Sequence, residues 1–117
     1  MEIQEFGKLQ DDTKASLLTI ENKNGMRLSM TDFGAAIVSL QVPDRDGRLV
    51  DVVLGYDKVA DYETDTNAFG ATIGRVGNRI AGAKFVIDGR SYALDANDGK
   101  QSLHGGFHGY HKRMWHY

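Results

Sequence analysis

Lys84-Phe-Val-Ile-Asp-Gly-Arg-Ser-Tyr-Ala-Leu94 is the stretch that most clearly predicts the fold. It holds two short runs of β-forming residues, Phe85–Ile87 and Ser91–Leu94, on either side of the pair Asp88-Gly89. An Asp-Gly pair tolerates the positive φ angles of a type I′ turn, so the stretch predicts a tight β-hairpin. We therefore expect antiparallel strands joined by short turns.

The residues before this hairpin repeat the same alternation of apolar runs and turn residues. Met26, Leu28 and Met30 alternate with polar residues, which places them on one face of a strand. The polar segment 57–69 could hold one short helix or only a loop. Several short strands at close spacing predict an all-β fold, an antiparallel sheet or β-sandwich. The expected strands are 16–21, 26–30, 35–42 and 49–54, with turns at 22–25 and 43–47.

Length and composition are those of one small globular domain. The chain has 117 residues, of which 41% are hydrophobic and 26% charged. We take residues 1–117 as a single domain unit and expect the polar segment 1–14 to be poorly ordered.

Charge and hydropathy disfavour several classes of function. The formal net charge is −2, and no basic run is longer than Lys112-Arg113, which disfavours a nucleic-acid partner. No apolar stretch approaches the ~20 residues that span a membrane. The chain has no cysteine, so neither a disulfide framework nor a cysteine metal site is available. We expect a cytoplasmic protein without membrane contact.

Asn78 and Arg79 are the first candidate site residues. They follow Gly74 and Gly77 in a glycine-rich segment, where the backbone can come close to a ligand. Arginine offers a fixed fork of donors, and asparagine offers both a donor and an acceptor, which suits a neutral polyhydroxyl ligand. The alternative is a surface arginine beside a turn asparagine.

His104 is the second candidate, because Gly105 and Gly106 leave its imidazole uncrowded. Near neutral pH an imidazole can donate to or accept from a ligand oxygen. The alternative is a histidine in an ordinary loop. The chain's other histidines follow at 108, 111 and 116, but the glycines make a helix improbable there and no acidic residue accompanies them, so we expect no metal site.

Five aromatic residues in the second half of the chain could pack against the C–H faces of a sugar. For any one of them, ordinary packing is the simpler explanation. They are Tyr92, Phe107, Tyr110, Trp115 and Tyr117.

Two motifs together resemble the aldose 1-epimerase family. Phe69-Gly-Ala-Thr-Ile-Gly-Arg-Val-Gly-Asn-Arg-Ile-Ala81 is similar to the family's signature around Gly-Asn-Arg-Ile. Leu103-His-Gly-Gly106, followed by Gly109, Lys112-Arg113 and Trp115, is similar to its second signature, although His111 stands where the family usually has an aspartate. The resemblance runs from about Leu17 to Trp115, in the family's order.

The resemblance implies an antiparallel β-sandwich that interconverts the α and β anomers of hexoses such as galactose or glucose. It implies no metal and no organic cofactor. Asn78, Arg79 and His104 match family positions that contact the sugar, and His104 is the candidate for a catalytic role on this chain. A small-molecule hexose is the expected partner.

The resemblance covers only the first third or so of the family's length. The family's principal acid, a later histidine, and its base, a glutamate near the C-terminus, have no counterpart in this sequence. Two alternatives to an active epimerase therefore stay open: a sugar-binding remnant without activity, and an interaction module that uses an exposed sheet edge. Unpaired strands would also allow the chain to associate with itself.

Overall fold

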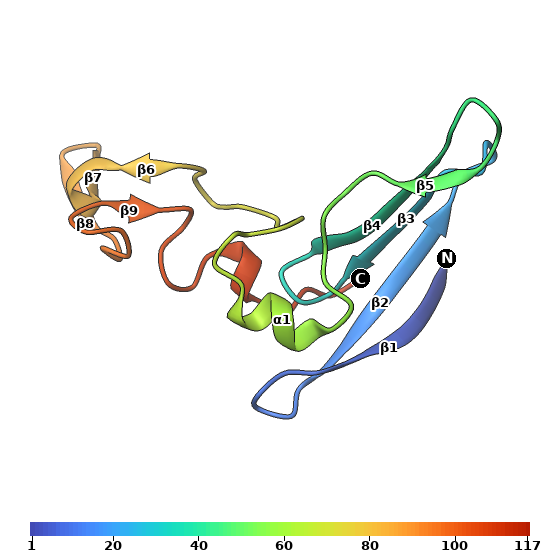
Figure 1. Cartoon of the computed structure of the whole chain (residues 1–117). Coiled ribbons are helices and arrows are strands. Elements are labelled where there is room, and N and C mark those ends of the chain that lie inside the picture. The colour runs from blue at the N-terminus through green and yellow to red at the C-terminus, as the bar shows by residue number, and fades with distance from the viewer.

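The computed structural model describes all residues from Met1 to Tyr117 and is built almost entirely from antiparallel strands. Its largest sheet has five strands in sequence order, each paired with the next (Figure 1). The four strands expected in the first half are present, the last of them ending at Asp51 and not at Leu54, which confirms an all-β antiparallel fold. The five strands of the sheet are β1 (Glu2–Lys8), β2 (Lys14–Glu21), β3 (Arg27–Thr31), β4 (Ala36–Pro43) and β5 (Leu49–Asp51).

The second half of the chain forms two small two-stranded sheets. One pairs β6 with β9, and the other is the hairpin of β7 and β8. The single α-helix, α1, falls inside the polar segment that could have been helix or loop. The bounds are β6 (Arg79–Ile80), β7 (Lys84–Ile87), β8 (Arg90–Ala93), β9 (Ser102–Leu103), α1 (Val59–Thr64), and short 3-10 turns at Ala81–Ala83 and Tyr110–Lys112.

The two small sheets stand apart from the large one, as Figure 1 shows. The radius of gyration is 17.1 Å, and the molecule extends over 56 × 36 × 24 Å. A compact chain of this length would have a radius of gyration of about 13 Å. The segments 65–78 and 104–113 join the two parts, so both candidate motifs lie where the small sheets begin.

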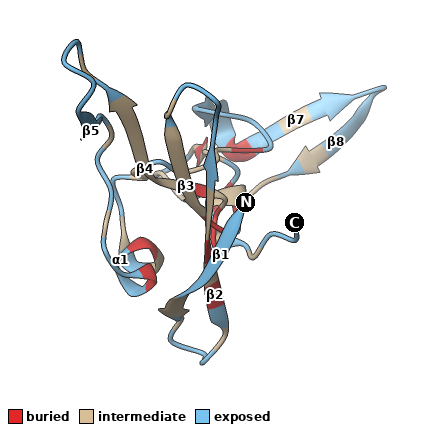
Figure 2. Ribbon diagram, turned by 90° about the vertical axis from the view of Figure 1, so that its right-hand side faces the viewer, coloured by how far each residue is buried: buried red, intermediate tan, exposed pale blue.

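The hydrophobic core lies at one end of the large sheet, beneath α1. It consists of five buried residues from β2, the β3–β4 connection, β4 and α1, shown in red among tan and blue neighbours in Figure 2. Lys112, close to the second motif, donates from Nζ to the main-chain oxygens of Tyr62, Glu63 and Asp65 at 3.2, 2.8 and 3.1 Å. This ammonium therefore binds the end of α1 and ties the returning chain to the core. The core residues are Ala15, Phe33, Ala36, Val59 and Tyr62.

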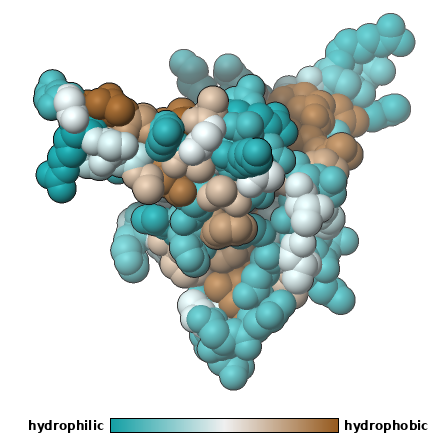
Figure 3. Space-filling view, turned by 90° about the vertical axis from the view of Figure 1, so that its left-hand side faces the viewer, coloured by the Kyte–Doolittle hydropathy of each residue, from teal (hydrophilic) through white to brown (hydrophobic).

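One face of the large sheet is apolar and largely uncovered. Leu28 of β3 pairs with Leu40 of β4 and with Ile20 of β2, and all three alternate with polar neighbours. Ile20 is 49% exposed, and Val50 of β5 is 44% exposed. Figure 3 shows apolar surface, in brown, in several separate patches among hydrophilic surface, in teal. The alternation predicted from Met26 to Met30 therefore gives a real apolar face.

The predicted hairpin is confirmed in detail. Asp88 and Gly89 have φ angles of 50° and 76°, and Ile87 pairs with Arg90 across the turn. The Phe85 and Tyr92 rings stack with centroids 5.1 Å apart on one face. Asp-Gly is suited to this turn because both residues must adopt positive φ.

The N-terminal segment differs from the expectation of poor order. Glu2 to Lys8 form β1, which pairs with β2 from Glu2 opposite Thr19 onward. Phe6 reaches the core, with its ring centroid 6.1 Å from that of Tyr62. Backbone pairing and this one aromatic anchor order a segment whose composition is otherwise polar.

No helix in the structure is long and apolar enough to cross a lipid bilayer.

Candidate functional site

The β6–β9 ladder brings the two sequence motifs together. Arg79 pairs with Leu103, so Asn78 and His104 lie opposite each other at the end of the ladder. The His104 amide donates to the Asn78 carbonyl at 3.0 Å, and the Asn78 amide donates to the His104 imidazole Nδ1, also at 3.0 Å. Three residues chosen from segments far apart in the sequence therefore form one polar cluster, which we call the Asn78–His104 cluster: Asn78, Arg79 and His104.

The backbone at this cluster is held in an unusual conformation. Asn78 and His104 have φ angles of 63° and 55°, in the left-handed region that few residues other than glycine adopt readily. Gly105 follows with a φ of 90°, and a Cβ atom there would overlap the carbonyl oxygen of Gly74. The glycine after His104 is thus required by close backbone contact, and not only to leave the imidazole uncrowded.

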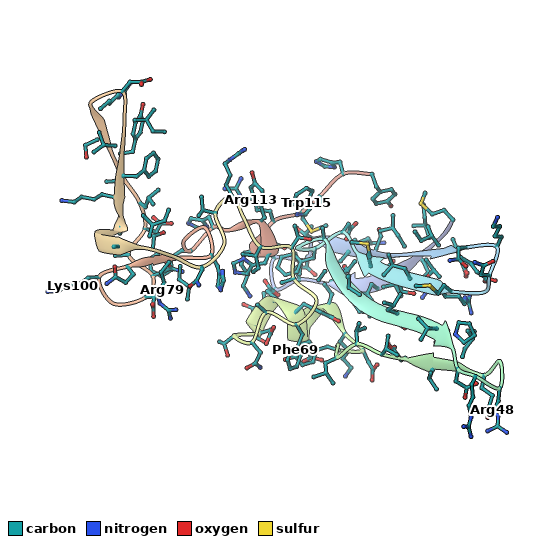
Figure 4. The ribbon with its side chains drawn as sticks, turned by 90° about the horizontal axis from the view of Figure 1, so that it is seen from above. Arg48, Phe69, Arg79, Lys100, Arg113 and Trp115 are labelled. Carbon is teal, nitrogen blue, oxygen red and sulfur yellow. The ribbon has the colours of Figure 1, made fainter.

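Arg79 is held by an ion pair and keeps part of its guanidinium available. Its Nε donates to Asp98 Oδ2 at 2.6 Å, and its Nη1 lies 3.5 Å from Asn78 Oδ1. The side chain is still 55% exposed. Figure 4 shows Arg79 at the rim of the small-sheet region, near Lys100. A guanidinium fixed through Nε presents its remaining donors in a defined direction.

The hydrogen bond to His104 Nδ1 sets the state of the imidazole. A nitrogen that accepts from a backbone amide carries no proton, so the neutral ring has its proton on Nε2. No protein group bonds Nε2 in the structure. His104 therefore offers one N–H donor to a ligand.

Three polar residues that position the cluster were not among the site residues expected from the sequence. The Asn97 side chain forms two hydrogen bonds with the Leu103 backbone. Asn97 Nδ2 donates to the Leu103 carbonyl at 2.9 Å, and Asn97 Oδ1 accepts from the Leu103 amide at 2.7 Å. Asp98 holds Arg79, and Gln101 Oε1 accepts from the Gly82 amide at 2.8 Å. The signal available was the run of Asn and Asp residues, whose side chains bond nearby backbone groups.

A cavity of about 680 Å³ lies beside the ladder. Asn78 lines it, whereas Arg79 and His104 do not. Of the aromatic residues considered as sugar-packing candidates, Tyr110 alone lines this cavity. Tyr92 stacks on Phe85, and the remaining three belong to the chain's end: Phe107, Trp115 and Tyr117.

The histidines after His104 do not join the cluster as a set. No three histidine, aspartate or glutamate side chains converge on a possible metal position. His111 instead is half-buried against the core side, where its Nδ1 has no hydrogen-bond partner.

His111 gives the fold an expected pH dependence. Burial, and then the nearby positive charge of Lys112, lower the pKa of His111 below its ordinary value of 6.5. The unfolded chain then binds a proton more readily than the folded chain, so stability is full above pH 6.5 and declines as pH falls through 6.5 toward the lowered pKa. Urea unfolding at pH 7.5 and pH 5.5 measures how much free energy of unfolding is lost between the two. We expect His111→Gln to lose less of it than the wild type. The exposed His116→Gln is the control, and an identical loss in all three proteins would contradict the assignment.

Comparisons with known proteins identify the family. A sequence model described as Aldose 1-epimerase matches residues 16–117. The galactose mutarotase of Bos taurus is 46% identical over 90 residues, which cover 77% of this chain and 26% of that protein. The aldose 1-epimerase of Haemophilus influenzae is 44% identical over 105 residues, covering 90% of this chain and 30% of that protein.

Solved structures agree on the fold. The GalM/aldose epimerase homologue from C. elegans is 37% identical, with a TM-score of 0.81, and the match covers 87% of this chain and 31% of that one. A galactose 1-epimerase from Lactobacillus acidophilus superposes with a TM-score of 0.77 at 24% identity, which shows a shared fold. The chain thus spans between about a quarter and a third of the length of these relatives. The motifs, the strand order and the two sequence comparisons converge, and the chain belongs to the aldose 1-epimerase family.

Proposed function

We propose that this chain supplies the hexose-binding part of an aldose 1-epimerase, a single domain unit in which Asn78, Arg79 and His104 hold the sugar. The observation that carries the proposal is the reciprocal hydrogen bonding between Asn78 and His104, which joins both family motifs in one cluster. The names of the relatives, galactose mutarotase and aldose 1-epimerase, support a hexose as the ligand.

Mutarotation sets the chemical demands on such a site. Because the proposed residues of this chain act as hydrogen-bond donors, water takes the proton of the anomeric hydroxyl and supplies one to the ring oxygen as the bond between C1 and the ring oxygen breaks. The open aldehyde turns about the C1–C2 bond and closes again with the proton transfers reversed. Negative charge develops on oxygen during these steps, so fixed donors aimed at oxygen accelerate them.

The state of the His104 imidazole supports a particular role for it. A full proton transfer from His104 to the ring oxygen would require both ring nitrogens to be protonated first, and that would break the bond that Nδ1 accepts from the Asn78 amide. We therefore propose that His104 donates a hydrogen bond from Nε2 and stabilises charge on a sugar oxygen. Arg79 would fix a second oxygen, oriented by Asp98.

Polarimetry of fresh α-D-galactose and α-D-glucose tests the proposed activity. We expect a rate of anomer interconversion above that of buffer, which saturates with sugar concentration and falls to the buffer rate in His104→Ala. His116→Ala is the matched control, since that exposed histidine lies outside the cluster. A wild-type rate equal to that of buffer would contradict epimerase activity in this chain.

A cytoplasmic location and self-association through unpaired strands remain predictions of the sequence.

A further inference from the structure

His104 lies in a tight turn whose backbone needs external support. The turn runs from Leu103 to Gly106 and is closed by the Gly106 amide, which donates to the Leu103 carbonyl at 3.0 Å. Both central residues have positive φ angles, 55° at His104 and 90° at Gly105. A residue with a side chain keeps such an angle only where its surroundings fix it. The direction of the His104 imidazole therefore depends on what holds this turn.

The β6–β9 ladder alone is too short to hold the turn. Each of its strands has two residues, and an isolated pair of short strands is marginally stable in water. The His104 amide donates toward β6, to the Asn78 carbonyl. Because successive peptide groups of a strand point to opposite sides, the amide and carbonyl of Leu103 face away from β6. These two groups need partners outside the ladder.

Asn97 supplies both partners with one side chain. Its Oδ1 accepts from the Leu103 amide at 2.7 Å, and its Nδ2 donates to the Leu103 carbonyl at 2.9 Å, both partly buried. The carboxamide takes the place of a neighbouring strand at the open edge of β9. It fixes the residue directly before His104, at the carbonyl that also closes the turn with Gly106.

Asn97 is held in place by the turn that follows it. The Asp98 amide donates to the Gln101 carbonyl at 3.2 Å, and the Gln101 amide donates to the Asp98 carbonyl at 2.9 Å. The Asp98 side chain binds Arg79 of β6, so this turn is attached to both strands of the ladder. Two adjacent residues therefore support different members of the cluster: Asp98 supports Arg79, and Asn97 supports His104.

We propose that Asn97 is a positioning residue for the reaction of the Asn78–His104 cluster. Its bonds to Leu103 keep the His104 imidazole where Nδ1 accepts from the Asn78 amide, and so keep the donor on Nε2 aimed at the sugar. The inference rests on the proposed role of His104 and adds a residue that acts through it. It predicts that loss of the Asn97 side chain impairs turnover, whereas sugar binding through Arg79 persists.

The tautomer of His104 tests the positioning without sugar and without activity. At about pH 8 an ordinary histidine is neutral, and long-range ¹H–¹⁵N spectra of the full chain distinguish a protonated ring nitrogen from a bare one. We expect Nδ1 of His104 to be bare in the wild type. In Asn97→Ala the signals of the two nitrogens should move toward each other, because a released ring exchanges between both tautomers. An Asn97 side chain that served only overall stability would leave these signals unchanged.

Two further variants make this measurement specific. Asn97→Asp keeps the acceptor for the Leu103 amide and loses the donor to the Leu103 carbonyl, so its spectrum should lie between those of wild type and Asn97→Ala. It is also the variant to measure if Asn97→Ala does not fold. Asn22→Ala is the matched control, since Asn22 also binds two backbone amides, in the distant turn between β2 and β3. Amide signals of residues 84–94 that match those of the wild type show that a variant is folded.

Polarimetry with galactose tests the consequence for the reaction. We expect Asn97→Ala to lower kcat by about tenfold or more, with KM within about twofold of the wild type, because a misdirected donor loses charge stabilisation and not binding. Asp98→Asn should show the opposite division, a raised KM, because it releases Arg79 and leaves His104 in place.

The outcomes separate this inference from the proposed activity. A His104 spectrum that is unchanged in both Asn97 variants would overturn the positioning role. Displaced nitrogen signals together with a lowered kcat would support it. Displaced signals with a wild-type kcat would overturn it as well, and with it the proposed role of His104. If the wild-type rate equals that of buffer, the proposed activity fails, and the positioning of His104 by Asn97 is then decided by the imidazole spectra alone.

Discussion

Gly105→Ala is expected to abolish hexose binding and to destabilise the small-sheet region by about 3 kcal/mol. The added Cβ would overlap the Gly74 carbonyl, which is backbone and cannot move away cheaply. It would also force alanine into a φ of 90°. Relief of the overlap separates the two segments that carry Asn78 and His104, so the cluster is lost. Galactose titration and urea unfolding measure the two effects.

Gly99→Ala is the matched control for this substitution. Gly99 also has a positive φ, 60°, but a Cβ there meets nothing within 4 Å. It should therefore show only the backbone cost of about 1 kcal/mol and should retain galactose binding. If the two variants behaved alike, close contact at Gly105 would not be what holds the cluster together.

Lys112→Met is expected to lower the free energy of unfolding by about 2–3 kcal/mol, the usual value of hydrogen bonds from a charged group. The ammonium group donates to three main-chain oxygens at and just after the end of α1, whereas methionine keeps the apolar stem without the charge. The change is large for this chain, since only 14 of its 117 residues are buried. The connection between the core and the second motif should loosen as well.

Chemical unfolding of Lys112→Met beside Lys100→Met measures this effect. Lys100 is exposed and forms no hydrogen bond or ion pair in the structure, so its variant should stay within about 0.5 kcal/mol of wild type. Equal stability of the two variants would show that the bonds to the end of α1 contribute nothing.

Local sequence signals predicted most of the strands. The hairpin around Asp88-Gly89 depends on two adjacent residues, and its flanking runs alternate as strands do, so no distant contact was needed to identify it. The same holds for β2 and β3, where alternation and a turn of Asn and Gly define the pair. Short-range chemistry therefore accounts for an all-β antiparallel chain.

Local sequence patterns could not predict the contacts between residues that are far apart in the sequence. Residue types alone made Asn78 and His104 candidates, but only the β6–β9 ladder places them opposite each other. The roles of Asn97 and Asp98 depend on where 95–100 folds back, and β1 depends on a partner strand and on Phe6 reaching Tyr62. Composition does not encode these distances, so local patterns assigned no role to residues 95–100 and no strand to the polar N-terminus.

Titration of galactose into ¹⁵N-labelled chain, followed by amide NMR, tests the central claim most directly. The account predicts saturable shifts at the amides of Asn78, Arg79 and His104, loss of these shifts in Arg79→Met, and their retention in Arg90→Met. Shifts confined to other residues, or shifts at the cluster that are unchanged in Arg79→Met, would contradict it.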